Sequence, residues 1–394
     1  MQQSCSKCLY PVSHPFGLEM NENECTGCLT HKEKNKIDWD LKKEQLVNIF
    51  GKYKKQNSSY DCIVPVTGDA EDYYTLSTVL AHGLAPLVVC VNDYFKNEIG
   101  WYNLHNLITH FDVDSFVFNP DFIIYKELIR TSLRKYDHML LPFLQLHTSF
   151  PVHVAKERKI PLIIWGQNQA VEQVGKFSHH DSVEMSCWSR KEHDLFGVDV
   201  NKLTGNGAQI RERNLNYYHY PEIEKLSSSN VRGLYLSNYM RWDPLAQNFR
   251  MLNYGFKPEK NMSSFDIYER AGSSIYYGIH DLLKFKRHGY RKVADHIARE
   301  IRHGRLTVES GNYLKQAYQS RQIYIKPFFD WLGVTKSGYD WYKKYNLKNV
   351  SKLISESSDV GPKKINLPKP IIEKMTIACE AEQHFMTFGK GVSI

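Results

Sequence analysis

Short runs of consecutive apolar residues alternate with segments of helical periodicity over the first half of the chain. Such runs are typical of strands buried on both faces, and their alternation with helices indicates a parallel, doubly wound sheet. We interpret as strands the runs at 61–66, 86–91, 115–119, 139–144 and 161–166. Helices are expected over 72–82, 100–110, 121–133 and 149–157. The pattern therefore predicts a Rossmann-like α/β domain, whose ligands would bind beyond the carboxyl ends of the strands.

The pattern changes at about residue 264, where strand-like runs give way to Tyr-rich segments of helical spacing. Apolar positions recur at helical intervals over 275–285, 293–301 and 312–324. Pro and Lys dominate 361–370, which predicts an irregular tail. We therefore expect three parts: a cysteine-containing module over 1–45, the α/β domain over 46–263, and a helical C-terminal region over 264–394.

Length and composition place the chain among ordinary globular proteins. It has 394 residues, of which 42% are hydrophobic and 24% charged, which excludes a disordered chain and a small disulfide-stapled scaffold. No apolar stretch approaches the roughly 20 residues of a transmembrane helix. The N-terminus has neither the charged nor the apolar segment of a secretion signal. We therefore expect a cytoplasmic protein.

Basic residues outnumber acidic ones by 51 to 43, a formal net charge of +8. This excess is compatible with an anionic small molecule, a nucleotide or RNA as partner. The charges are scattered, with small clusters at 32–36 and 284–292, and each cluster is typical of a solvated face. Charge alone therefore does not choose among these partners.

Four of the eight cysteines lie in the first 28 residues, as two pairs. Cys5 and Cys8 form one pair, and Cys25 and Cys28 form the other, with 16 residues between the pairs. Thiolates two residues apart reach one ion from a single tight turn, and the second pair completes a tetrahedron. The spacing predicts a closed, structural Zn2+ site. Four free thiols, or a redox-active pair, are the alternatives.

The segment between the first predicted strand and the helix after it contains a glycine and three carboxylates. It reads Thr67-Gly68-Asp69-Ala70-Glu71-Asp72. A glycine-containing turn into a helix offers free N–H groups to an anion. The carboxylates would repel a bare phosphate but could hold a divalent cation that carries one; alternatively, Asp69 and Asp72 are helix caps. Both interpretations remain open from the residues alone.

Five segments together resemble the N-acetyl sugar amidotransferases, a family within the PP-loop ATP pyrophosphatase superfamily. They appear in the family's order and spacing over most of the chain. The segments are CSKCLYP…FGLEMNENECTGC, YDCIVPVTGD, HGLAPLVVCVND, RKIPLIIWGQN and GIHDLLKFKRHGY…IAREIRHGRL. The resemblance implies a PP-loop type of α/β fold with an N-terminal zinc-ribbon module.

The resemblance also implies a reaction. Members of the family convert an N-acetyl group of a nucleotide-linked sugar to an acetamidino group for bacterial surface polysaccharide, here lipopolysaccharide or O-antigen. ATP with Mg2+ would activate the amide oxygen at the PP-loop, and ammonia from a separate glutaminase would displace it. An amide oxygen is a poor leaving group, so the protein would contribute positioning and charge stabilisation.

Motif by motif, the resemblance assigns roles to residues of this chain. ATP would be held by Thr67, Gly68, Asp69, Gly166, Gln167 and Asn168. Catalytic roles fall to Glu71, Asp72, Asp281 and Lys284. Substrate binding falls to His280, which shares a helix face with Lys284, and to the two guanidinium groups of Arg302 and Arg305, which suit a diphosphate.

Several of these positions depart from the family pattern. Its loop reads SGGxDS, whereas here Asp69 replaces the second glycine, Glu71 replaces the aspartate and Asp72 replaces the final serine. A side chain at the second glycine obstructs close approach of a phosphate. Gln167 stands where the family has Glu, and Val308 where it often has Arg.

Three hypotheses follow. The chain is an active amidotransferase in which Glu71 replaces the loop aspartate on Mg2+, or a non-hydrolysing paralogue that binds or assembles components of the same pathway. A third is a tRNA-modifying PP-loop enzyme. That chemistry generally needs a reactive thiol, and Cys187 is the plausible one outside the predicted strands and the zinc site.

Overall fold

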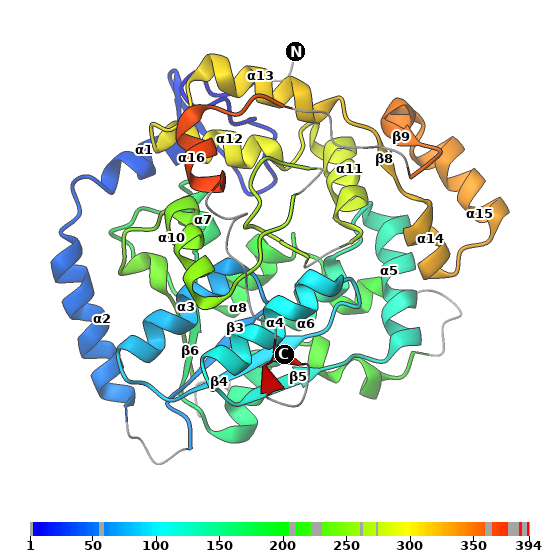
Figure 1. Cartoon of the computed structure of the whole chain (residues 1–394). Helices are drawn as coiled ribbons and strands as arrows, with labels where there is room; N and C mark the ends of the chain where they lie inside the picture. Colours follow the sequence, from blue (N-terminus) through cyan, green and yellow to red (C-terminus); the bar gives the residue numbers. More distant parts are fainter. Residues whose placement is uncertain are drawn as a thin grey trace.

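The fold is built on one parallel sheet of five strands, β3 (Cys62–Val66), β4 (Pro86–Val91), β5 (Ser115–Phe118), β6 (Leu162–Trp165) and β7 (Arg232–Tyr235). The computed structural model (Figure 1) describes residues 3–54, 59–204, 210–221, 231–260, 263–272, 275–358, 365–376, 386–387 and 392–393. The strand order is β5-β4-β3-β6-β7. Starting from β3, the chain adds β4 and β5 on one side and then β6 and β7 on the other, so the strand order reverses between β3 and β6. This is the doubly wound topology that the sequence predicts.

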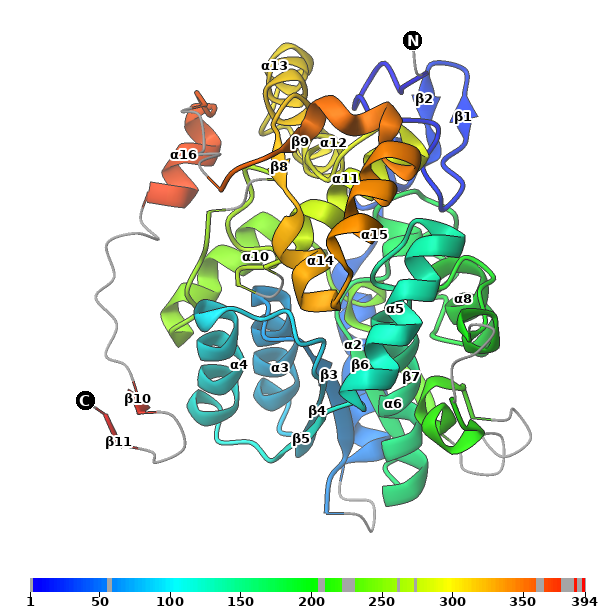
Figure 2. The same ribbon diagram turned by 90° about the vertical axis from the view of Figure 1, so that its right-hand side faces the viewer.

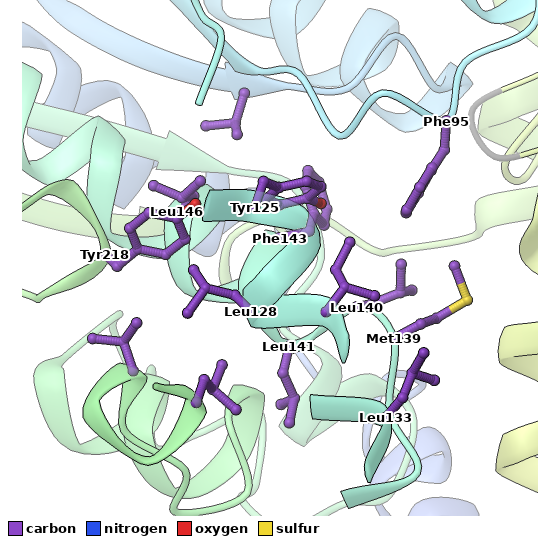
Figure 3. Packing of buried hydrophobic residues seen from close by; sticks show 14 of the residues in the cluster. Phe95, Tyr125, Leu128, Leu133, Met139, Leu140, Leu141, Phe143, Leu146 and Tyr218 are labelled. Carbon is purple, nitrogen blue, oxygen red and sulfur yellow. The ribbon is translucent and has the colours of Figure 1, made fainter. Parts of the chain in front are cut away.

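Helices cover both faces of this sheet. Figure 2 shows α3 (Ala70–Ala81) and α4 (Glu98–His110) on one side, with α5 (Phe122–Tyr136) and α6 (Leu141–Arg158) on the other. Side chains of β3 alternate accordingly: Ile63 packs in the α5–α6 core, and Val64 packs in the α3–α4 core. Figure 3 shows part of the first core, where Tyr125, Leu128 and Phe143 lie close together.

One strand prediction is wrong and one strand was missed. The apolar run 139–144 starts helix α6, because Pro142 occupies the first turn, where its missing N–H costs nothing. The first turns of this helix are buried on nearly every side, so apolar residues follow one another there without the periodicity that separates a helix from a strand. The fifth strand is instead β7, whose sequence Arg-Gly-Leu-Tyr carries no apolar run. The helix predictions at 72–82, 100–110 and 121–133 are confirmed, with small shifts of their ends.

The N-terminal segment forms a small β-hairpin and two helices. The hairpin pairs β1 (Met20–Asn21) with β2 (Glu24–Cys25), and α1 (Thr26–Glu33) and α2 (Trp39–Tyr53) follow. Asp38 caps α2 by accepting the N–H of Leu41 at 2.9 Å. The hairpin and α1 therefore bring the two cysteine pairs into one cluster.

The C-terminal region is mainly helical. Its principal elements are α11 (Tyr277–His288), α12 (Val293–Arg302), α13 (Val308–Gln319), α14 (Lys326–Leu332), α15 (Lys336–Trp341) and α16 (Lys369–Thr376). Short strands β8 (Ile323–Tyr324) and β9 (Ile354–Ser355) pair in parallel, and β10 (Met386–Thr387) pairs with β11 (Val392–Ser393). The helices predicted at 275–285 and 293–301 are confirmed. Figure 1 places α11, α12 and α13 at the top of the molecule and the sheet in its lower half.

Three short helices complete the part of the α/β domain relevant to the site: α7 (Gln169–Glu172), α8 (Cys187–Ser189) and α10 (Pro244–Arg250). Among the described residues, no helix has both the length and the apolar character needed to span a bilayer. Of the segment 361–370, residues 361–364 lie outside the described residues, 365–368 form neither helix nor strand, and α16 begins at Lys369.

Candidate functional site

The loops that follow β3 and β6 lie side by side at the carboxyl edge of the sheet. The first runs from Thr67 to Asp69 and enters α3, and the second runs from Gly166 to Asn168 and enters α7. Because β3 and β6 are adjacent and flank the reversal of strand order, this is the position where open α/β sheets bind ligands. The structure thus brings together the six residues that the sequence assigned to ATP.

Two glycines make this junction possible. Gly68 has φ +99°, and a Cβ there would lie 3.0 Å from the backbone nitrogen of Leu104. A Cβ on Gly166 would lie 2.3 Å from Oε1 of Glu71. Gly68 thus lets the first loop pack closely against α4 in a left-handed conformation, and Gly166 leaves room for the Glu71 side chain between the two loops.

The carboxylate of Asp72 fills the ring of donors formed by the first loop. Its Oδ2 accepts the N–H groups of Thr67 at 2.6 Å, Gly68 at 2.8 Å and Asp69 at 3.0 Å. The Thr67 hydroxyl donates to the same oxygen at 3.0 Å. A concave set of backbone N–H groups is the kind of site that binds phosphate in other proteins. Here the chain supplies the anion itself.

Glu71 joins the two loops. Its Oε1 accepts the N–H of Gln167 at 2.8 Å, through the space that Gly166 leaves open. The pKa of Glu71 is raised to about 7. Burial is the main cause, the Gln167 N–H opposes the shift, and the nearby charge of Asp72 adds to it. Burial and Asp72 also raise the pKa of Asp69. The acidic loop is therefore crowded with carboxyl groups that resist ionisation.

A cavity of about 200 Å³ lies directly in front of this loop. Thr67, Asp69, Glu71 and Asp72 form one wall. The facing wall comes from the C-terminal region and carries mostly charged side chains, namely Glu269, Arg270, Lys292, Asp295, His296, Arg299 and Arg302. We call this space the central cavity. It joins the two parts of the chain that the sequence associated with ATP and with substrate.

Most charges on the facing wall already neutralise one another. Lys292 Nζ lies 2.6 Å from Glu269 Oε1, and Arg299 Nη2 lies 2.6 Å from Asp266 Oδ2. His296 Nε2 lies 2.5 Å from Glu269 Oε2. Asp266, Glu269 and His296 are close enough to share a metal ion, but Lys292 and Arg299 already provide positive charge to both carboxylates. This group is therefore best described as a buried ion network.

A second cavity, of about 310 Å³, shares the Glu71, Gln167 and Arg270 side chains with the first. Its lining is rich in imidazole and aromatic groups, including His138, His147, His193, His280, Trp165 and Tyr277. Burial lowers the pKa of His147 and of His193 to about 4, so both are neutral at pH 7. Neutral imidazoles and aromatic faces suit an uncharged polar group, although charged side chains such as Asp194, Lys284 and Arg287 also line this cavity.

The four N-terminal cysteines form one buried cluster whose sulfur atoms all lie within 4.8 Å of one another. Cys8 Sγ and Cys25 Sγ are 3.6 Å apart, close to the edge of about 3.8 Å that Zn–S bonds of about 2.3 Å give to a tetrahedron. The residues therefore fit a closed four-thiolate site for a metal such as zinc. When bound, zinc would supply folding energy there and no open position for chemistry.

Arg302 connects this cluster to the central cavity. Its Nη2 donates to Cys8 Sγ at 3.6 Å and to Cys25 Sγ at 3.5 Å, and its Nη1 donates to the Gln173 carbonyl at 2.7 Å. The pKa of Cys25 is lowered to about 6, first by the hydrogen bond with Cys28 and also by the charge of Arg302. The sequence assigned Arg302 to substrate; its hydrogen bonds lie with the cysteine cluster, while its side chain still borders the cavity.

The other substrate and catalytic candidates are spread over both cavities and the core. Lys284 Nζ lies 2.6 Å from Asp295 Oδ2 and borders the second cavity. His280 borders the same cavity. Asp281 is buried and accepts the N–H of Lys292 at 2.6 Å. Arg305 pairs with Asp243 at 2.7 Å and with Glu300, so it bridges two carboxylates behind the wall.

Asn168 has a local structural role. Its side-chain oxygen accepts the N–H of Ala170 at 3.2 Å and so caps α7, and its own N–H donates to Ser237 Oγ at 2.8 Å. The residues that sequence reasoning missed are Arg270, Lys292, Glu269 and His147, all of which border both cavities. Lys292 lies within the Lys284–Lys292 cluster that the sequence assigned to a solvated face, yet it is 8% exposed. Tyr290 and Arg291 beside it are also buried, so this end of the cluster is not a solvated face.

Comparison with known proteins gives one partial match to a family. Residues 259–352 match a family described as the C-terminal domain of WbpG-like LPS biosynthesis proteins. This segment carries the facing wall of the central cavity, from Glu269 to Arg302. No curated protein matches the chain.

Among solved structures, the chain is similar to an NMN synthetase from Francisella tularensis. The two share 12% identity over 57% of this chain and 99% of that one, with a TM-score of 0.28. Likeness at this level carries no argument about function.

Proposed function

We propose that the chain works in lipopolysaccharide biosynthesis and binds a nucleotide-linked N-acetyl sugar in the central cavity, in the manner of an N-acetyl sugar amidotransferase. One observation carries the proposal. The segment that matches the WbpG-like domain and the loop that resembles a PP-loop form opposite walls of the same cavity. The charged lining of the central cavity suits the diphosphate, and the imidazole and aromatic faces of the second cavity suit the sugar.

As an active amidotransferase, the chain would use ATP and Mg2+ at the loop to activate the N-acetyl oxygen for O-antigen synthesis. Thr67, Gly68 and Gln167 would contact ATP, and Glu71 would contact Mg2+. Ammonia would come from a separate glutaminase. Glu71 supports this form, because it borders the cavity and its pKa, raised first by burial to about 7, lets it gain or lose a proton near neutral pH.

The position of Asp72 favours a second form of the function, and the geometry supports this form better. Its carboxylate takes all three N–H groups that Thr67, Gly68 and Asp69 could offer to a phosphate. In this form, the chain binds the same sugar nucleotide without hydrolysing ATP and serves as a binding or assembly subunit of the pathway. Gln167, in place of the family's carboxylate, is consistent with that loss.

An assay driven by ammonium chloride separates the two forms, because it needs no glutaminase. The purified chain is incubated with ATP, Mg2+ and UDP-N-acetyl sugars, and mass spectrometry detects the amidino product. We expect sugar-nucleotide binding without product in the wild type, and product in the triple variant Asp69→Gly, Asp72→Ser, Gln167→Glu. Product from the wild type would establish the active form. Failure to bind any nucleotide-linked sugar would refute the proposal as a whole.

A further inference from the structure

The acidic wall of the central cavity has no backbone donor left for a ligand in the loop from Thr67 to Asp69. All three N–H groups donate to Asp72 Oδ2, at distances between 2.6 and 3.0 Å. Asp69 and Glu71 add further carboxyl groups beside it. A phosphoryl group would have to displace the Asp72 carboxylate from all three N–H groups and lie beside the carboxyl groups of Asp69 and Glu71. An anionic ligand of this cavity therefore needs a different site.

The facing wall supplies a candidate in Arg270. Its guanidinium makes no hydrogen bond or ion pair with any residue that the structure describes, and its Nε is buried without a partner. The guanidinium lies over the Tyr277 ring, 4.9 Å from the ring centroid. By contrast, Lys292 and Arg299 are paired with carboxylates on the same wall. The charges of Asp69, Glu269 and Asp93 act on Arg270, but none of these residues forms an ion pair with it, so its N–H groups remain available to a ligand.

Arg270 is also rigidly placed. Its backbone has φ +60°, a left-handed conformation that a residue with a side chain adopts only where its surroundings impose it. Asp266 Oδ1 accepts the N–H groups of Tyr268 at 2.8 Å and Glu269 at 3.1 Å, just before Arg270. Glu259 Oε2 accepts the N–H of Gly272 at 2.7 Å, just after it. Two carboxylates therefore fix the turn that presents this guanidinium.

The same side chain borders three cavities. It lines the central cavity, the histidine-rich second cavity, and a third of about 510 Å³ that reaches Ile323 and Phe328. A group bound at Arg270 would lie where a ligand extends from one cavity into the next. This is a place for a charged group within an elongated ligand, whose other parts extend into the neighbouring cavities.

We propose that Arg270 is the anion-binding residue of this site and takes a phosphoryl or diphosphate group of the ligand, while the Thr67–Asp72 loop keeps its own carboxylate. The planar guanidinium offers two parallel N–H donors to such a group. The inference deepens the proposed function and rests on it for the identity of the ligand. The anion site itself does not depend on amide transfer.

Isothermal titration with inorganic pyrophosphate tests this assignment on four proteins: the wild type, Arg270→Gln, Asp72→Ser and Arg158→Gln. Arg158 is an exposed residue at the far end of α6 and serves as the charge-matched control. We expect the wild type to bind, Arg270→Gln to bind about tenfold more weakly or worse, and the other two to stay within about threefold of the wild type. Circular dichroism verifies that each variant is folded.

Absence of binding by the wild type overturns the inference, as does an unchanged affinity in Arg270→Gln. The double variant Asp72→Ser, Arg270→Gln is titrated as a fifth protein, and binding about tenfold or more tighter than the wild type in that variant would place the anion site in the loop instead. If Arg270→Gln does not fold, Arg270→Lys replaces it: it keeps the charge but loses the paired donors, so affinity should fall about threefold or more, and unchanged affinity refutes the assignment. A parallel titration with UDP-N-acetylglucosamine and other UDP-N-acetyl sugars tests the proposed function separately, since pyrophosphate binding without sugar-nucleotide binding would sink only the latter.

Discussion

The two walls of the central cavity solve the burial of charge in different ways. The loop wall collects Asp69, Glu71 and Asp72 and satisfies Asp72 with backbone N–H groups of the same loop. On the facing wall, Lys292 and Arg299 pair with carboxylates, and Arg270 has no such ion pair. The N–H groups of the first wall are therefore occupied by a side chain of the same loop, whereas the second wall keeps a positive charge that a ligand can reach. A loop in the phosphate-binding position of the fold is thus not enough to locate the phosphate site.

The largest expected effect comes from disrupting the cysteine cluster, to which Arg302 of the facing wall is hydrogen-bonded. Cys25→Ser should abolish stoichiometric metal binding and lower stability by on the order of 5 kcal/mol, because metal binding at a closed site contributes folding free energy. Elemental analysis and thermal unfolding measure the two effects. The matched control Cys187→Ser lies outside the cluster and should keep both values. A wild-type protein that holds no metal after purification without chelators would contradict the zinc site.

The ion network should respond next most strongly. Lys292→Met removes the ammonium group 2.6 Å from Glu269, which keeps His296 and Arg299 as partners. Breaking a buried pair outright costs about 3–5 kcal/mol, so we expect a loss at or below that range. Urea denaturation measures the loss, and the double variant Lys292→Met, Glu269→Gln should recover part of it. Equal losses in the single and double variants would show that the pair is not coupled.

Glu71 sharpens the comparison through pH. Burial raises its pKa in the folded protein to about 7, against 4.5 in the unfolded chain. The folded state thus holds the extra proton between these values, so stability falls as pH rises through that window, by at most about 3 kcal/mol. Glu71→Gln removes this cost, and we expect its melting temperature to exceed that of the wild type by about 3 °C at pH 8 but not at pH 4. The exposed control Glu44→Gln should show no such pH dependence; a Glu71→Gln gain that is equal at both pH values would contradict the assignment.

The smallest effect is expected at Asp72 itself. In Asp72→Asn the amide oxygen can still accept the N–H groups of Thr67, Gly68 and Asp69, so stability should change by about 1 kcal/mol or less. Chemical denaturation measures the change, and Asp72→Leu, which has no acceptor, should lose about 1–3 kcal/mol. If the leucine variant were as stable as the asparagine variant, the carboxylate would not be satisfying the loop.

Much of the fold was predictable because its strands are apolar runs. The segments 61–66, 86–91, 115–119 and 161–166 all contain strands. The run 139–144 misled because a helix buried on all sides shows no polar face. Strand β7 could not be predicted because Arg-Gly-Leu-Tyr has no apolar run; it is identified as a strand only by its pairing with β6.

The site divided in the same way. The cysteine spacing and the loop residues were visible because each is local in sequence. Arg270 was not, because its lack of an ion pair depends on how Asp266 and Glu269 pair with Arg299 and Lys292 across the C-terminal region. The capping alternative at Asp69 and Asp72 is confirmed, because the two residues form a capping box at the start of α3. What the sequence did not show is that the same Asp72 oxygen also accepts the N–H groups of Thr67 and Gly68.

The central claim is that this cavity binds its anion at Arg270 while Asp72 occupies the loop. Crystals soaked in pyrophosphate, and separately in ATP with Mg2+, test it most directly. The account predicts phosphoryl density against the Arg270 guanidinium, with Asp72 Oδ2 still accepting the N–H groups of Thr67, Gly68 and Asp69. Phosphoryl density inside the loop, with the Asp72 side chain turned away from it, would contradict the account.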